Sequence, residues 1–518
     1  MNIFAKGQGA FIKVISLAIG LTVGLVLIAK VQLEMNYDRC IVDKQHVYAV
    51  GESFTKEGDD PAEHENTPGG AIPALCHYIP EIVVGTRYTY QFRNEKLALE
   101  DGSRYAFEHT VFADSCFFDI FGTRILQGDA KRILSTSGQC LISRRLSDKM
   151  GGDVVGKTIT FVAAPSKPMT ISGVFETFDE NSTFSLLDIV MSMPSIGTYS
   201  YDGTRNLIGN DRYRSYVRLR ADADMKKVEH EMDKMLKEQL PWEDLKAAGV
   251  EDFHFKFSPT SDSRMKDKRV RTTCIILGIV AFVMLFTAVM NYILVVISMM
   301  VGKARLVAIR KVLGAPKREF YLMTLRGAAL HLLLALLIMV LLLTAGQDWI
   351  RDLMGASVST LFSIQTWLVL TVVCLIVLVC CGLLPGYIYS RIPMVYAYRL
   401  FTENKRIWKL SLLAFQFVLS TMLLCILSTI YRQYDYMLNK DLGYKYKDVA
   451  YIEIPQRSDS TFTLAREIEK LPCVESTSTA YSLFFEKQSG NNVMLPGDPK
   501  QLFNYACLYW AEPSIVKN

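Results

Sequence analysis

The 518-residue chain lacks the sequence patterns of common hydrolases and of metal sites. It contains neither G-x-S-x-G nor H-E-x-x-H, and its seven histidines are dispersed. None of its eleven cysteines belongs to a C-x-x-C pair, and the adjacent Cys76 and His77 are too isolated to hold a metal. Acids such as Asp179 and Glu180 are best explained as solvated surface. We therefore expect no enzyme activity, no metal and no cofactor in this chain.

A strong net charge is also missing, which argues against a nucleic-acid partner. The net charge is +5, and the basic residues cluster beside hydrophobic runs, as membrane-flanking charges do. Cysteine inside a hydrophobic run is usually a small packing residue, and five of the eleven lie there: Cys274, Cys374, Cys380, Cys381 and Cys425. The other six allow one or two disulfides in an oxidising compartment, but the sequence does not pair them.

Long hydrophobic runs are what the sequence does have. Five windows approach or exceed the roughly 20 apolar residues that a helix needs to cross a bilayer. They cover residues 11–29, 272–299, 327–344, 367–389 and 409–430. The first is followed by Lys30 and Glu34 and by no small-x-small cleavage site, so we interpret it as an uncleaved anchor and not as a signal peptide.

The basic residues between the windows predict the orientation of the chain. Seven of them lie between the second and third windows, opposed by Glu319 alone: Lys303, Arg305, Arg310, Lys311, Lys317, Arg318 and Arg326. Five more lie between the fourth and fifth windows: Arg391, Arg399, Lys405, Arg406 and Lys409. We expect both loops and the N-terminus in the cytoplasm, and residues 31–269, 345–365 and 431 onward outside it.

Few polar residues lie deep in these windows. Lys13 is close enough to the cytoplasmic end to extend its ammonium group to the surface. Asn291 and His331 are interpreted as partners in helix–helix hydrogen bonds, with a role in a transport pathway as the alternative. No series of acids and histidines resembles a proton relay, so a proton-driven or ion-driven transporter is disfavoured.

The segment between the first two windows predicts a mixed α+β domain with its own core. Residues 47–50, 88–92, 156–162, 169–175 and 215–219 have the β-branched and aromatic composition of strands. Residues 224–240 repeat apolar side chains every three or four positions, which predicts an amphipathic helix.

Residues 151–158 read GGDVVGKT, which matches the phosphate-binding loop G-x-x-x-x-G-K-[ST]. That loop requires a buried strand before it and a helix after it. Here a polar, helix-like segment (143–150) precedes and a strand-like segment follows, so the nucleotide interpretation is rejected. We predict a turn at Gly156 and Lys157 that leads into a β-hairpin whose second strand includes residues 170–175.

Residues 301–320 (VGKARLVAIRKVLGAPKREF) predict a basic amphipathic helix, with Leu306, Ile309, Val312 and Leu313 on one face. Gly314 is a helix stop, and Pro316 is a suitable first residue for the next helix. Such a helix either lies on anionic lipid or presents its apolar face to the groove of a partner. Composition alone leaves both alternatives open.

Within this loop, residues 308–315 (AIRKVLGA) resemble the A-I-R-K-x-L-G-A motif of the MacB-like and FtsX-like permeases, the type VII ATP-binding-cassette permeases. Residues 109–128 are similar to a segment of that family's external domain, and the stretch 140–157 that follows accounts for the false phosphate loop. In that family the loop helix docks on a cytoplasmic ATPase. The resemblance therefore implies these ATPase-coupling residues: Leu306, Ile309, Arg310, Lys311, Leu313, Gly314 and Ala315.

The end of the chain resembles family members that are built as two tandem halves with eight membrane helices. The first window leads through residues 35–38 (MNYD) to a strand at 46–50, and the fifth leads through residues 433–436 (QYDY) to an expected strand at 449–454. On this resemblance the chain would stop partway through a second external domain. We expect a C-terminally truncated tandem permease.

The resulting domain prediction has five parts. They are residues 1–31, the cytoplasmic N-terminus and first helix; 32–269, a MacB-like periplasmic domain; 270–392, an FtsX-like core with helices two to four and the coupling loop 301–320; 393–430, a cytoplasmic linker and helix five; and 431–518, an incomplete second external domain.

The resemblance implies the permease subunit of an ATP-binding-cassette transporter in a bacterial inner membrane, exporting a peptide, drug or lipoprotein by mechanotransmission. The implied partners are a cytoplasmic ATPase, a second permease in a homodimer or heterodimer, the lipid bilayer, and a periplasmic adaptor with an outer-membrane channel. The alternative is an FtsX-like signalling subunit that regulates a cell-wall hydrolase or senses an antimicrobial. Export is favoured because the FtsX external domain is much smaller than residues 32–269. A membrane receptor without an ATPase is a further alternative.

Overall fold

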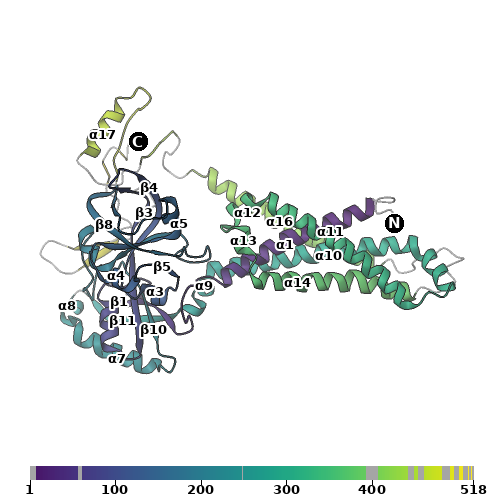
Figure 1. Cartoon of the computed structure of the whole chain (residues 1–518), viewed down its shortest axis with the longest axis horizontal. Helices are drawn as coiled ribbons and strands as arrows, with labels where there is room; N and C mark the ends of the chain where they lie inside the picture. Colours follow the sequence, from purple (N-terminus) through teal and green to yellow (C-terminus); the bar gives the residue numbers. More distant parts are fainter. Residues whose placement is uncertain are drawn as a thin grey trace. The chain divides into compact units, whose positions relative to one another are not determined.

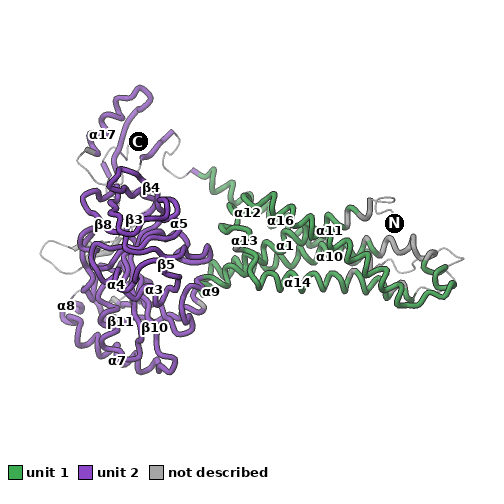
Figure 2. Tube along the Cα trace, viewed as in Figure 1, with its two compact units in different colours: residues 1–37, 264–440 green, residues 38–263, 441–518 purple. Residues whose placement is uncertain are grey.

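The chain divides into two compact units in a computed structural model, each built from two stretches of sequence. The described residues are 8–56, 61–247, 249–391, 407–441, 448–452, 460–480, 491–494, 501–505, 511–512 and 515. A helical unit comprises Met1–Tyr37 and Arg264–Lys440, and a β-rich unit comprises Asp38–Ser263 and Asp441–Asn518 (Figure 2). The first helix is therefore separated in sequence from the rest of the helical unit by an inserted domain.

The inserted domain contains eleven strands in one mixed sheet. The strands are β1 (Val47–Lys56), β2 (Ala62–His64), β3 (Ile82–Leu99), β4 (Arg104–Ala113), β5 (Ile125–Gln127), β6 (Gln139–Ser143), β7 (Thr158–Phe161), β8 (Ala164–Phe175), β9 (Leu187–Ser192), β10 (Arg214–Leu219) and β11 (Val250–Pro259). Their order is β11-β1-β10-β3-β4-β9-β6-β8-β5, with β2 on β1 and β7 joined to β3 and β8. Figure 1 labels β1, β3, β4, β5, β8, β10 and β11. Neighbouring strands are antiparallel except β4 with β9 and β6 with β8.

Short helices accompany this sheet and complete its hydrophobic cores. They are α2 (Ala71–Tyr78), α3 (Phe117–Ile120), α4 (Ala130–Ser135), α5 (Arg144–Lys149), α6 (Ile196–Tyr199), α7 (Met225–Gln239) and α8 (Trp242–Ala247). The predicted amphipathic helix is confirmed as α7, whose buried positions Val228, Met232, Met235 and Leu236 recur every three or four residues. The α+β prediction for this domain is therefore confirmed.

The central strands β6 and β9 were not among the strands named from alternating composition. All six residues of β9 are buried, as are four of the five in β6. Strands that are buried on both faces have continuous apolar sequences. They lack the alternation of apolar and polar residues that marks a strand with one solvent-exposed face. Half-exposed strands such as β10, in which buried and partly exposed residues alternate, were consequently easier to predict.

The false phosphate loop is confirmed as a turn. It follows helix α5 and precedes strand β7, which is the reverse of the strand–loop–helix order that phosphate binding requires. Gly151, Gly152 and Gly156 have φ of 95°, 85° and 89°, values that favour glycine. The Gly156 N–H donates to the carbonyl of Ile171 at 2.7 Å, so this loop is tied to β8, with which β7 forms the predicted antiparallel pair.

The helical unit contains the membrane-spanning candidates. Its helices are α1 (Gln8–Met35), α9 (Ser263–Lys266, which begins at the boundary), α10 (Lys268–Val312), α11 (Lys317–Ala345), α12 (Gln347–Met354), α13 (Val358–Leu361), α14 (Ile364–Leu378), a π-helical segment (Val379–Leu383), α15 (Leu384–Arg391) and α16 (Ile407–Asn439). Four stretches of the described chain are long and apolar enough to cross a membrane: Val14–Met35, Lys268–Leu294, Lys317–Ala345 and Leu413–Asn439.

The remaining predicted window, residues 367–389, is helical but interrupted. Its first part, α14, has 15 residues and is too short to be counted as a span by itself. The π-helical segment and α15 continue it to Arg391. Pro385 explains the interruption, because proline has no N–H to donate and its ring clashes with the carbonyl four residues earlier, at Cys381 within the π-helical segment.

Small residues and interhelical hydrogen bonds hold α1 against α10. A Cβ atom on Gly20 would overlap Ala288, and one on Gly24 would overlap Leu285, so both glycines permit close approach of the two helices. The predicted helix–helix hydrogen bonds are confirmed. Asn291 Nδ2 donates to Ser16 Oγ at 2.7 Å, and Tyr292 Oη lies 2.8 Å from Nδ1 of His331.

The C-terminal region contributes α17 (Ser460–Glu469), β12 (Asn491–Met494) and β13 (Gln501–Tyr505). The prediction of a strand at 449–454 is wrong for residues 449–452, which form no strand and are exposed. Residues 453–454 lie outside the described residues. The nine cysteines that the structure describes are all free. The side chain of Lys13 and the predicted cytoplasmic linker at 393–406 also lie outside the described residues.

Candidate coupling site

The predicted coupling loop, residues 301–320, comprises the end of one long helix, a glycine cap and the start of α11. Helix α10 has 45 residues and runs from the second membrane window to Val312 without a break. In its last turns Val307 and Ala308 are buried, whereas Ile309, Val312 and Leu313 are 41%, 52% and 80% exposed. We call these three exposed side chains the 309–313 patch. They follow each other at helical spacing and form an apolar surface at the end of a helix that also crosses the membrane window.

A glycine C-cap ends α10 and leaves Leu313 at a corner. The Ala315 N–H donates to the Arg310 carbonyl at 3.0 Å and the Gly314 N–H donates to the Lys311 carbonyl at 3.0 Å, which are the two hydrogen bonds of a Schellman motif. Gly314 has φ of 88°, a conformation that a side chain would strain. Pro316 occupies the N-cap position of α11, one residue before its predicted place in the helix.

Two basic residues of the predicted site fasten this corner to neighbouring helices. Lys311 Nζ donates to the carbonyl of Ser390 at 2.8 Å and lies 5.7 Å from the ring centroid of Phe320. Burial, reinforced by the nearby Lys317 charge, lowers the pKa of Lys311. Arg310 lies 3.8 Å from the Glu319 carboxylate. These contacts stabilise the corner. Both cations interact with neighbouring helices and not with solvent alone.

The seven residues predicted for coupling thus fall into different environments. Ile309 and Leu313 are exposed, Arg310 and Lys311 contact neighbouring helices, and Gly314 and Ala315 form the cap. The side chain of Leu306 lies outside the described residues. Val312 belongs to the exposed patch but stands at the variable position of the motif, so the resemblance did not select it. Its spacing from Ile309 was the signal that could have done so.

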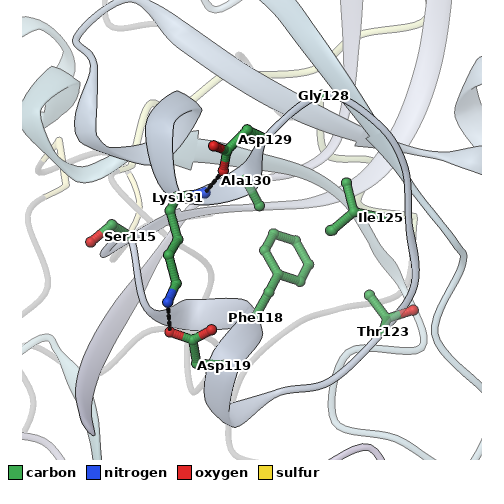
Figure 3. A pocket seen from close by; sticks show the side chains of 9 residues that line it. All are labelled: Ser115, Phe118, Asp119, Thr123, Ile125, Gly128, Asp129, Ala130 and Lys131. Carbon is green, nitrogen blue, oxygen red and sulfur yellow. Dashed lines mark hydrogen bonds and ion pairs between the residues drawn. The ribbon is translucent and has the colours of Figure 1, made fainter.

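A second candidate is a hollow of about 430 Å³ in the β-rich unit (Figure 3). Lys131 and Asp119 lie across it and form an ion pair of 2.8 Å, while Asp129 caps the start of α4. The charges of Lys131 and Asp119 therefore neutralise each other, and the pair joins α4 to α3. Among the described residues, no group of three or more His, Cys, Asp or Glu side chains is arranged to hold a metal ion. The hollow is a weaker candidate than the 309–313 patch.

Two family models match successive parts of the chain. The MacB-like periplasmic core domain matches residues 10–235, and the FtsX-like permease C-terminal domain matches residues 278–394. The chain belongs to the family of MacB-like and FtsX-like permeases. The second match includes the end of α10, its glycine cap and α11, so the candidate coupling site lies in the permease domain.

A crystallised domain of a protein described as a permease, from Porphyromonas gingivalis, is 32% identical over 42% of this chain and 91% of its own, with a TM-score of 0.38. The periplasmic region of MacB from Actinobacillus actinomycetemcomitans is 15% identical over 44% of this chain and 96% of its own, with a TM-score of 0.30. No curated protein matches.

Family membership makes this chain a membrane protein and a permease of the ATP-binding-cassette class. Permeases of this family are generally not enzymes themselves and work with ATP-binding-cassette ATPases. The candidate site offers an exposed apolar surface at the end of a long helix.

Proposed function

We propose that this permease couples ATP hydrolysis by a separate cytoplasmic ATPase to a conformational change in residues 38–263, and thereby exports a peptide, drug or lipoprotein. The 309–313 patch carries the proposal. Its three apolar side chains are exposed at the end of α10, and burying them against a partner would stabilise the complex by roughly 25 cal/mol per Å² of apolar surface. On this proposal the chain itself has no ATPase activity.

The continuity of α10 favours a protein partner over lipid as the occupant of the patch. A helix that lies flat on a membrane has to turn away from the spanning helix before it, whereas α10 continues unbroken through the patch. Arg310 and Lys311, the cations that would reach lipid phosphates, are engaged with α11 and α15 instead. A 45-residue helix is roughly 67 Å long at 1.5 Å per residue, so motion at the patch would be carried along its whole length.

The same reasoning gives a topology in the bacterial inner membrane. We place the N-terminus and the corner between α10 and α11 in the cytoplasm, because basic residues crowd that corner. Residues 38–263 then lie in the periplasm, where an adaptor, an outer-membrane channel and a second permease copy would meet them. The size of this domain supports export over a signalling role.

Replacing Ile309 and Leu313 by aspartate tests the proposal. A carboxylate at either position would have to be desolvated in the interface, so we expect co-purification of the ATPase to be lost. Leu186→Asp is the matched control, because Leu186 is 45% exposed and lies in the β-rich unit. Undiminished ATPase binding by the Ile309→Asp and Leu313→Asp double variant would reject the coupling role of the patch.

A further inference from the structure

Three charged side chains meet where the helical unit connects to the inserted domain. Glu34 lies in the last turn of α1, Lys30 one turn earlier, and Arg264 in α9. Lys30 Nζ lies 3.0 Å from Glu34 Oε1, while Arg264 donates from Nε at 2.9 Å and from Nη2 at 2.8 Å to Glu34 Oε2. Each oxygen of this carboxylate therefore holds its own cation. The Glu34 side chain is only 13% exposed, so solvent screens these interactions weakly.

Arg264 is held from a second direction by an aromatic ring. Its guanidinium carbon lies 4.1 Å from the centroid of Tyr37, two residues after the end of α1. A guanidinium can stack on a ring and donate two hydrogen bonds in the same plane, whereas an ammonium group cannot. The α1 end and the α9 start are thus joined by an ion pair and a cation–π contact that an arginine can make at the same time.

The end of α1 is also bonded to the segments that follow α11. Lys30 Nζ donates to the Met354 carbonyl at 2.7 Å, at the C-terminus of α12, where a cation is favoured by the free carbonyls and the helix dipole. Asn36 Nδ2 donates to Gln365 Oε1 at 2.9 Å in the first turn of α14. Polar contacts at the end of α1 thus reach α9, α12 and α14; Glu34 contacts Arg264 of α9 directly and, through Lys30, is connected to α12.

The position of this network in the chain indicates a role in transmitting motion to the inserted domain. The chain leaves the helical unit after Tyr37 and returns to it at Arg264, so both connections to the inserted domain pass through the network. The glycine contacts between α1 and α10 are van der Waals contacts, which allow one helix to slide along the other. A largely covered carboxylate that holds two cations fixes one register, because moving it leaves charges without partners.

We propose that Glu34 is a positioning residue for transport: with Lys30 and Arg264 it forms a charged clamp that makes the end of α1 move as one with α9, the short helix that leads into α10. The clamp rests on the proposed function, since it matters only if motion at the 309–313 patch drives the inserted domain. Without Glu34, Lys30 and Arg264 face each other as like charges. The two connections then move independently, and motion of α10 reaches the inserted domain through one connection only.

The test uses the full chain with its ATPase in lipid nanodiscs and measures hydrogen–deuterium exchange of residues 38–263 with and without a non-hydrolysable ATP analogue. Glu34→Gln removes the charge with little change in shape. Glu63→Gln is the matched control, because Glu63 forms a 2.6 Å pair with Lys256 on the surface and is 59% exposed. ATPase binding and ATP turnover are measured in parallel, since a merely structural defect would lower them too.

We expect Glu34→Gln to keep ATPase binding and turnover within about twofold, as expected for a site remote from the ATPase, and to lose at least about half of the nucleotide-driven exchange difference. Glu63→Gln keeps the full difference. Arg264→Gln acts in the same direction as Glu34→Gln but more weakly, because Lys30 still neutralises Glu34. Arg264→Lys, which keeps the charge and loses the stacked geometry, recovers part of the response.

The outcomes separate the clamp from the proposed function. A full nucleotide-driven difference in both Glu34→Gln and Arg264→Gln overturns the clamp and leaves the function standing. No difference in the wild-type complex overturns the proposed function itself, and the clamp with it. If Glu34→Gln does not fold, Arg264→Gln decides, since it leaves the carboxylate paired with Lys30.

Discussion

The two units of this permease are stabilised by different kinds of contact in their interiors. In the β-rich unit the Asp188 carboxylate is fully buried and is satisfied by Ser143, Arg145 and a backbone N–H. In the membrane windows of the helical unit, packing depends on glycines, and large apolar side chains such as Phe282 are 68% exposed. The difference follows from the solvent: the β-rich unit excludes water from its core, whereas the helices gain nothing by hiding apolar groups from lipid.

This comparison predicts that a change at Asp188 has the largest effect on stability. Asp188→Ala would leave Ser143 Oγ, the Glu108 N–H and the Arg145 guanidinium without their acceptor in a buried site. Breaking such a network by removing one partner costs about 3–5 kcal/mol. Urea unfolding of residues 38–263 as a separate protein measures the loss of unfolding free energy. Asp188→Asn, which keeps an acceptor oxygen, should lose less, and equal losses for the two variants would contradict the network's importance.

In the helical unit the sensitive groups are the glycines rather than the charges. Gly20→Leu would force α1 away from Ala288, and overpacking of this kind costs about 1–3 kcal/mol. Gly278→Leu is the matched control, because a Cβ at Gly278 meets no atom within 4 Å. We expect thermal unfolding in detergent to shift downward for Gly20→Leu alone. A similar shift for both variants would mean that the effect comes from the added leucine and not from the helix contact.

The units also differ in how far the sequence could predict them. The membrane helices were located from hydrophobicity alone because lipid requires long apolar runs, and the one interruption, before Pro385, depends on local hydrogen bonding that composition does not record. In the β-rich unit, half-exposed strands such as β10 were predicted from alternation, but the fully buried β9 was not.

The candidate sites show a similar limit. Ile309 and Leu313 were selected by a local motif, and a helix is a local structure, so their exposure could be anticipated. The clamp brings together Glu34 and Arg264, which are 230 residues apart in sequence. Neither residue stands out from its neighbours, and only the three-dimensional structure places them in contact.

Glu52 provides the finest test of the comparison, because it is a buried carboxyl group that lacks the cation Asp188 has. Its side chain is 3% exposed and faces the carboxylate of Asp211. Burial, followed by the charge of Asp211 and a hydrogen bond to it, raises the pKa of Glu52 from 4.5 to about 8. At neutral pH Glu52 is therefore protonated and donates to Asp211, whereas Asp188 is paired with Arg145.

A raised carboxyl pKa makes folding stability depend on pH with a definite sign. The folded state binds the Glu52 proton more tightly than the unfolded chain does. The folding stability that this proton contributes is therefore fully present below pH 4.5, declines as the pH rises, and is lost by about pH 8. Glu52→Gln keeps a donor and cannot ionise. We expect it to be close to the wild type in stability at pH 5 and to be more stable by several kcal/mol at pH 8.5, because each unit of pKa shift corresponds to about 1.4 kcal/mol; urea unfolding of residues 38–263 measures the difference. An equal difference at both pH values would show that Glu52 does not titrate in this range, and that the β-rich unit neutralises it in another way.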